Sequence, residues 1–277
     1  MGRRSKAAVV VAVLAVGSVT AAAQSQRKGR HTRASLLAEV ESLRPGESFW
    51  VGVRLQMEEP WHTYWKNPGD SGLATRVRWR LPDGLSAGPL VWPRPERMPS
   101  GPLMSYGYGG EVLLLTEMTP ARHLSARSAV IEARVDWLEC NEACLPGRAE
   151  LRLELPVGDH PPRPVDAWRP LFQRSRRLLP VKLVGWREAL SVSEGALTLS
   201  LSPPAGAKAL GADAYFFPAE PEWIEHAARQ RLAATPDGLS LTMERARNAV
   251  PPETLTGVLV AGSGSEARAY EIEARAR

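Results

Sequence analysis

Hydrophobic and polar residues alternate over several short stretches of the chain, which is the period of half-buried β-strands. The clearest alternation covers residues 49–56, 75–81, 149–155, 197–201 and 239–243. Turns rich in proline, glycine, aspartate and asparagine separate many of these stretches. Short strands at even spacing predict an all-β protein built from antiparallel β-sandwiches.

The same pattern predicts two immunoglobulin-like β-sandwich domains joined by a linker. The first domain is expected over residues 31–158 and the second over residues 181–277. The linker, residues 159–180, begins with a proline-rich break and can form a short helix that is kinked or begun at Pro170. The first segment of the first domain, residues 31–43, is compatible with a strand or with a short helix.

The chain has only two cysteines, Cys140 and Cys144, and strand-like stretches flank them at residues 130–137 and 149–155. On one straight strand their Cα atoms would lie about 13 Å apart. A disulfide needs Cα atoms within roughly 7 Å. Turn residues between and after the cysteines allow the chain to reverse there. The sequence therefore predicts a β-hairpin whose end carries a reversible cysteine pair.

A purely structural disulfide is the alternative for this cysteine pair. The loss of chain entropy from so short a loop stabilises a fold by only about 2 kcal/mol. Such a bond joins neighbours that the hairpin already holds together. The spacing therefore favours redox chemistry over a structural bond.

The N-terminus predicts a secretory signal peptide over residues 1–23. Arg3, Arg4 and Lys6 precede a short apolar run, and three alanines end the segment as in a cleavage site. The apolar run is too short for a comfortable membrane span, although an uncleaved anchor is the alternative. Cleavage would place the chain in an oxidising compartment, without an integral membrane span.

The formal net charge of +5 is concentrated in the expected signal peptide. Removing its three basic residues from the 35 in the chain leaves 32 basic against 30 acidic residues. This balance gives no electrostatic surface for nucleic acid. The chain lacks C-x-x-C, G-x-S-x-G and metal-type histidine spacings, so no cofactor or metal is expected. The isolated histidines are expected at surface or packing positions: His62, His123, His160 and His226.

Three longer motifs follow one another in the first half of the chain. They are WHTYWKNPGDSG at residues 61–72, WPRPERMPSGPLMSYGYGGEVLLLTEM at residues 92–118, and DWLECNEACLPGRAELRLELPVG at residues 136–158. Together they resemble the N-terminal periplasmic domain of the thiol:disulfide interchange protein DsbD family, in the branch associated with suppression of copper sensitivity. The resemblance covers most of residues 35–158 and extends more weakly to the end.

The resemblance implies an immunoglobulin-like domain that passes electrons through one cysteine pair by disulfide exchange. By position, Cys144 matches the cysteine that forms mixed disulfides, and Cys140 matches the resolving cysteine. The implied partners are periplasmic thioredoxin-like proteins and a transmembrane thiol reductase. The reductase is expected to be a separate polypeptide, because the sequence ends without the family's membrane-spanning part.

The resemblance also assigns four aromatic residues to the surroundings of the cysteines. Tyr106 and Tyr108 match a cap loop that gates access to the pair, and the glycines around them suit a mobile flap. Tyr64 and Trp65 match the supporting aromatic segment beside the pair. Core packing is the alternative for all four.

Three carboxylates close to the cysteines in sequence are expected to influence their chemistry. Asp136, Glu139 and Glu142 would disfavour a thiolate by like charge. With an aromatic cap above the pair, the reduced form would be an electron carrier with shielded thiols of low reactivity rather than a strong nucleophile.

Two other functions stay open. A C-x-x-x-C pair can bind Cu(I) as thiolates, and Met98, Met104 and His123 are further candidate ligands for a copper-tolerance protein. Known copper chaperones with this spacing have a thioredoxin-like scaffold with a helix after the motif, whereas a strand is expected here. The third function is a non-catalytic interaction domain with a structural disulfide.

Overall fold

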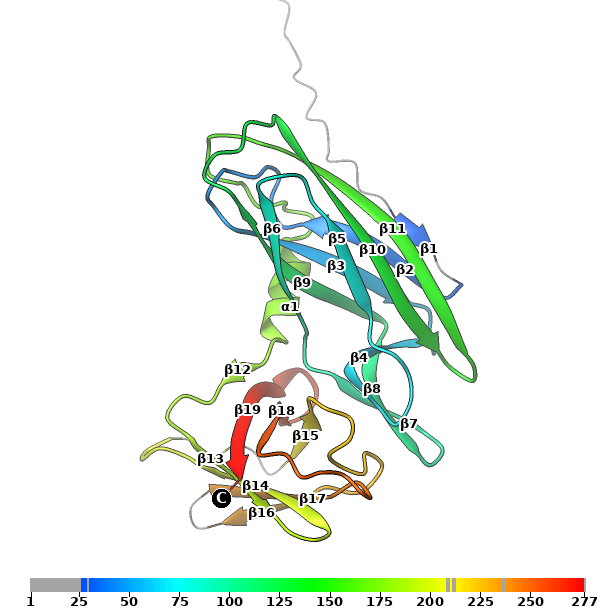
Figure 1. Ribbon diagram of the computed structural model, residues 1–277, viewed down its shortest axis with the longest axis vertical. Helices are drawn as coiled ribbons and strands as arrows, with labels where there is room; N and C mark the ends of the chain where they lie inside the picture. Colours follow the sequence, from blue (N-terminus) through cyan, green and yellow to red (C-terminus); the bar gives the residue numbers. More distant parts are fainter. Residues whose placement is uncertain (1–25, 29, 208–209, 211–212, 236–237, 277) are drawn as a thin grey trace, which may run out of the picture.

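The computed structural model describes residues 26–28, 30–207, 210, 213–235 and 238–276, so the expected signal peptide lies outside the described residues. The strands form three sheets, two of which use β1 to β11 while the third uses β12 to β19. Figure 1 shows the first two sheets layered in an upper body and the third sheet in a lower body. The expectation of an all-β, largely antiparallel protein is confirmed.

The first sheet has the strand order β1-β2-β3-β9-β6, and every pair in it is antiparallel. Its strands are β1 (Gln26–Lys28), β2 (Thr32–Ala38), β3 (Phe49–Met57), β6 (Leu85–Val91) and β9 (Glu111–Pro120). The segment that was compatible with strand or helix therefore contains the strand β2.

The second sheet has the order β11-β10-β4-β8-β7, and β5 also pairs with β10. Its strands are β4 (His62–Gly69), β5 (Arg76–Arg80), β7 (Glu96–Ser100), β8 (Leu103–Gly109), β10 (Ser128–Cys140) and β11 (Cys144–Pro156). The β10–β11 hairpin runs without a register shift from Ser128 opposite Pro156 to Cys140 opposite Cys144. The predicted hairpin is thus confirmed.

The core of the upper body lies between these two sheets. Val53 and Leu55 of β3 and Ile131 and Val135 of β10 are completely buried in one hydrophobic cluster. Val53 and Leu55 are two positions apart and Ile131 and Val135 are four apart, as expected when alternate residues of a strand face one side. Burial of these alternate residues is the main force that holds the two sheets together.

Helix α1 (Arg169–Arg177) covers the outer face of the first sheet, and it falls within the expected linker. Phe172 is completely buried against Leu37 and Leu113. Pro170 stands in the first turn of the helix, where a missing backbone N–H costs nothing. In the described part of the chain no helix combines the length and the apolar character needed to cross a membrane.

The third sheet has the order β15-β18-β19-β13-β14-β17-β16, with β12 beside β19. Its strands are β12 (Val181–Lys182), β13 (Arg187–Val192), β14 (Ala196–Ser202), β15 (Ala214–Pro218), β16 (Arg231–Thr235), β17 (Gly238–Glu244), β18 (Thr254–Ala261) and β19 (Arg268–Ala276). Phe216 of β15 and Leu241 of β17 share one core cluster although their strands lie near opposite ends of the sheet. The sheet therefore curves around its own core.

The two bodies are joined by direct contacts between β4 and β8 above and β15 below. The hydroxyl of Tyr106 lies 3.1 Å from the hydroxyl of Tyr215 and 3.1 Å from Nδ1 of His226. The side-chain amide of Asn67 donates a hydrogen bond of 2.9 Å to the backbone oxygen of Pro218. The second sheet is therefore packed on the lower body through hydrogen-bonded, buried side chains.

The protonation of His226 is expected to weaken this contact. Nε2 of His226 lies 2.7 Å from the backbone oxygen of Pro221, so Nε2 carries the proton and Nδ1 accepts from Tyr106 in the neutral ring. Burial lowers the pKa of His226 below its ordinary value of 6.5. The folded state therefore binds fewer protons than the unfolded state, and stability falls as the pH drops below that value.

We expect the wild-type protein to lose about 1 kcal/mol more free energy of unfolding than the His226→Gln variant when the pH falls from neutral to about 5.5. Urea unfolding of both proteins at the two pH values measures the difference. Carboxylates titrate in both proteins and cancel in the comparison. An equal loss in both would contradict the role given to His226.

Candidate functional site

The two cysteines form a disulfide at the end of the β10–β11 hairpin. Cys140 and Cys144 are the last paired residues of the two strands, with three turn residues between them. Their Cα atoms lie 4.2 Å apart and their sulfur atoms are bonded. The pairing predicted from the turn residues is confirmed.

The two halves of the disulfide differ in their access to solvent. Cys140 is 2% exposed, whereas Cys144 is an exposed residue. The strand order explains the difference, because β10 pairs with β11 on one side and meets His62 of β4 on the other at Cys140. Cys144 belongs to β11, which is the edge strand. A sulfur atom arriving from solvent therefore meets Cys144 first.

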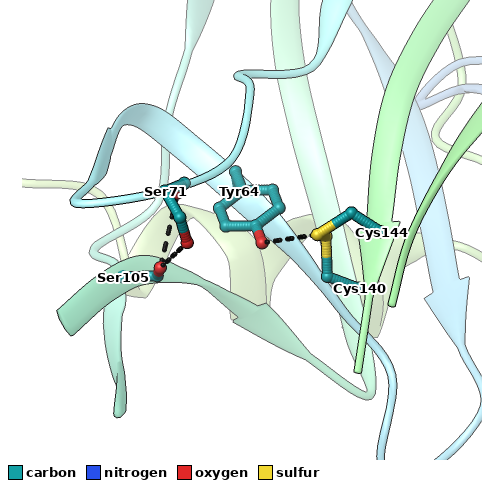
Figure 2. The surroundings of a disulfide bond; sticks show 5 residues. All are labelled: Tyr64, Ser71, Ser105, Cys140 and Cys144. Atoms are coloured by element: carbon teal, nitrogen blue, oxygen red, sulfur yellow. Dashed lines mark hydrogen bonds between the residues drawn. A yellow bond between two sulfur atoms is a disulfide. The ribbon is translucent and has the colours of Figure 1, made fainter. Parts of the chain in front are cut away.

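Tyr64 is the aromatic residue that touches the disulfide. Its hydroxyl lies 3.7 Å from Sγ of Cys144, as Figure 2 shows. Burial raises the pKa of Tyr64, so the hydroxyl keeps its proton and can donate it in a hydrogen bond. The contact predicted for Tyr64 is therefore present.

The loop after β4 packs directly on the ring of Tyr64. A Cβ atom at Gly72 would lie 2.2 Å from a ring carbon of Tyr64, so only glycine lets the backbone approach this closely. Ser71, next to this glycine, has its Oγ 2.9 Å from Oγ of Ser105 in β8. The loop of residues 70–75 thus forms a fixed cover over Tyr64 (Figure 2).

Trp65 points to the opposite face of β4, since neighbouring residues of a strand alternate between faces. It is 1% exposed, and its ring centroid lies 6.3 Å from that of Phe217 in an edge-to-face arrangement. Trp65 therefore packs between the two bodies rather than beside the cysteines. Of the predicted aromatic pair, only Tyr64 is at the disulfide.

The structure corrects the placement of Tyr106 and Tyr108. Both lie in the strand β8, which is paired with β4 on one side and β7 on the other, and both are buried. Tyr108 is directly opposite Thr63, so the two tyrosines face the side of the sheet away from Tyr64. The hydroxyl of Tyr108 donates to the backbone oxygen of Pro93 at 2.8 Å. The two tyrosines are strand residues that pack on the far side from the disulfide, not members of a cap loop.

The glycine between these tyrosines has a structural cause other than mobility. A Cβ atom at Gly107 would lie 2.0 Å from the backbone oxygen of Thr63. Glycine is therefore required because β8 approaches β4 too closely for any side chain. Gly107 therefore marks a close approach of two strands and not the flexible loop expected from the sequence.

The nearby carboxylates are largely engaged by other groups. Asp136 accepts a hydrogen bond of 2.5 Å from Nε of Arg148, and this contact is the main cause of its lowered pKa. Glu139 is buried and accepts a hydrogen bond of 3.1 Å from the backbone N–H of His31. Glu142 is exposed in the turn. These partners weaken the expected repulsion between the carboxylates and a thiolate.

His62 is a site residue that sequence analysis treated as isolated. Its backbone pairs with Cys140, and its ring centroid lies 5.3 Å from that of Tyr64 in an edge-to-face arrangement. Burial lowers the pKa of His62, so its ring is neutral at pH 7. The available signal was the spacing of His62 and Tyr64, because residues two apart on a strand share a face.

The candidate copper ligands come from different parts of the upper body. Met98 lies on β7 and Met104 on β8, whereas His123 follows β9 of the other sheet. Within the described ranges, no group of three or more histidine, cysteine, aspartate and glutamate side chains is arranged to hold a metal ion. No observation gathers these residues around the disulfide.

Comparison with known proteins finds a family match for the upper body. Residues 33–156 match the family described as thiol:disulfide interchange protein DsbD, N-terminal. The solved N-terminal periplasmic domain of ScsB from Proteus mirabilis superposes with a TM-score of 0.66 at 17% identity, over 92% of this chain and 99% of that one. At this identity the likeness shows the fold, and it extends over both bodies.

Two other matching solved structures are much less similar. The chimeric titin Z1Z2 has 12% identity and a TM-score of 0.20, over 90% of this chain and 99% of that chain. The major pilin subunit BcpA of Bacillus cereus has 7% identity and a TM-score of 0.26, over 87% and 66%. Likeness at this level supports no conclusion. No curated protein matches the sequence.

The matched residues contain the whole site described above. They include both cysteines, Tyr64 with its covering loop, and all of the β10–β11 hairpin. The fold of the upper body agrees with that of the ScsB domain. Residues 33–156 are therefore a domain of the family described as thiol:disulfide interchange protein DsbD, N-terminal.

Proposed function

We propose that the protein is a periplasmic thiol–disulfide exchange module that carries electrons through Cys140 and Cys144. The observation that carries this proposal is the unequal exposure of the two bonded cysteine residues at the hairpin end. Exchange needs one sulfur within reach of a partner and a second that can take its place in the bond. Membership of the DsbD N-terminal family supports the same chemistry.

The exchange proceeds through a mixed disulfide on Cys144. A thiolate of a partner dithiol attacks Sγ of Cys144, and the sulfur of Cys140 leaves as a thiolate and takes up a proton. The second thiol of the partner then loses its proton and attacks the partner's own bonded sulfur, which releases Cys144 as a thiolate that takes up a proton. Two electrons and two protons have then moved from the partner to Cys140 and Cys144. The reverse sequence passes them to the next protein.

The proposed partners are periplasmic thioredoxin-like proteins on one side and a separate transmembrane thiol reductase on the other. Both follow from the family of residues 33–156 rather than from a contact in the structure. The periplasmic location rests on the same family and on the expected signal peptide at residues 1–23. The similar ScsB domain is itself described as periplasmic.

Tyr64 is proposed to stabilise the reduced form of the pair. Its hydroxyl is 3.7 Å from Sγ of Cys144 and is held there by the loop over its ring. When Cys144 becomes a thiolate, this hydroxyl can donate to a charged acceptor, which stabilises it by about 1.5–3 kcal/mol. Tyr64 would then favour the thiolate without itself being exposed.

Replacing Tyr64 by phenylalanine should make the thiol of Cys144 less reactive at neutral pH. In a Cys140→Ser background, we expect the pH profile of alkylation by iodoacetamide to move up by about one pH unit, because the thiolate loses its hydrogen bond. The matched control is Tyr106→Phe, which removes a buried hydroxyl on the other face of the sheet. Identical profiles for wild-type and Tyr64→Phe backgrounds would exclude this role.

The two single-cysteine variants should differ in their ability to trap a partner. We expect Cys140→Ser to accumulate a mixed disulfide with a periplasmic thioredoxin-like protein, because exposed Cys144 remains. Cys144→Ser should trap little, because Cys140 is buried. Non-reducing electrophoresis and mass spectrometry detect the product.

The reduction potential of the wild-type bond separates exchange from a structural role. Exchange proteins have potentials of about −120 to −270 mV, whereas structural disulfides lie below about −300 mV. We expect a value in the first range, measured by equilibration with glutathione or a stronger dithiol. A value in the second range, together with no trapped partner for either variant, would show that the disulfide is structural.

A further inference from the structure

A groove of about 530 Å³ lies beside the disulfide on the outer face of the second sheet. Side chains two positions apart on a strand share a face, and the hairpin is in register. The pair Leu138 and Pro146 is therefore the next rung after the cysteines on their own face. Both residues line the groove, so one end of the groove lies a single rung of the hairpin, about 7 Å, from the disulfide.

The end of the groove near the disulfide is apolar. Besides Leu138 and Pro146, it is lined by Leu73 from the loop that covers Tyr64. Leu73 is 63% exposed and is one of the few large hydrophobic side chains of the described residues with such exposure. Together with exposed Pro146 and half-buried Leu138, it forms an apolar patch near the disulfide, and such a patch is typical of a surface that is covered by a partner.

The far end of the groove is positively charged. The rung beyond Leu138 and Pro146 is Asp136 and Arg148, and β5 adds Arg76 directly opposite Asp136. Asp136 is already engaged by Arg148 at 2.5 Å and by Arg134 at 3.3 Å. In the described part of the chain, no carboxylate lies within ion-pair distance of Arg76. The arginines therefore leave a net positive charge at this end.

We propose that the groove binds an extended segment of the partner polypeptide next to its reactive cysteine, and that this segment is apolar beside the cysteine and acidic further along. Arg148 is four residues from Cys144, which is about 13 Å along the strand. An extended partner segment covers that distance in about four residues. The acidic residue is therefore placed about four positions from the partner's cysteine. This inference rests on the proposed exchange at Cys144.

The test uses the full chain with Cys140→Ser and peptides whose single cysteine carries thionitrobenzoate. The thiolate of Cys144 attacks the cysteine sulfur of the peptide, a new disulfide forms, and one thionitrobenzoate anion leaves and is counted by its absorbance. Each peptide has a leucine beside the cysteine and either glutamate or lysine four residues away. Both directions of the peptide are tested.

We expect the glutamate peptide to react at least about five-fold faster than the lysine peptide at low ionic strength, with the difference shrinking as salt is added. Arg76→Glu should abolish or reverse the preference. Arg76 is exposed and without an ion pair within the described residues, so this substitution is not expected to disturb the fold. Arg148→Gln is a second variant that should reduce the preference without introducing a negative charge.

The control for the charge change is Arg80→Glu, on the same strand as Arg76 but outside the groove and 3.6 Å from Glu132, which should leave the preference unchanged. Equal rates for the two peptides would overturn the inference while leaving exchange at Cys144 intact. Failure of Cys144 to react with any peptide or protein disulfide would instead overturn the proposed function. A change in the mass of the protein in solution for Arg76→Glu, with peptide rates unchanged, would show that the groove joins two copies of the chain and would also overturn the inference.

Discussion

The in-register pairing of β10 with β11 is the constraint on which the site depends. The pairing is continuous from Ser128 opposite Pro156 to Cys140 opposite Cys144. Because side chains alternate with a period of two, a slip by one residue would move the cysteines apart and turn the buried residues outward. The burial of Ile131 and Val135 in the core therefore also fixes the position of the disulfide.

The two faces of the paired strands β4 and β8 have different roles: one contacts the disulfide and the other packs on the lower body. One face carries Tyr64 toward the disulfide, whereas the other carries Trp65 and Tyr106 toward the lower body. Contacts with Phe217 and His226 hold this second face from behind. The lower body therefore supports strand β4, which positions Tyr64. Its role in the site is structural, because it contributes no reactive residue.

Local pattern was enough to predict the hairpin, the cysteine pairing and most strands, because each depends on alternation and turn residues close in sequence. Alternation does not identify β2 as a strand, because both faces of β2 are buried, one by the core and one by α1. The role of Gly107 was missed because glycine serves both flexible loops and close strand packing. The contact with the backbone of Thr63, which is distant in sequence, distinguishes close strand packing from a flexible loop, and the sequence does not show that contact.

The edge position of β11 explains why this disulfide suits exchange better than stabilisation. A cysteine pair across two inner strands would bury both sulfur atoms, and a pair at a free loop would expose both. Here β10 is an inner strand and β11 an edge strand, so Cys140 is covered and Cys144 is open. A bond that closes a three-residue turn adds only about 2 kcal/mol to the fold, and that gain does not require the two sulfurs to differ. Exchange through a mixed disulfide does require this difference, because the partner must reach one sulfur while the second sulfur stays close enough to re-form the bond.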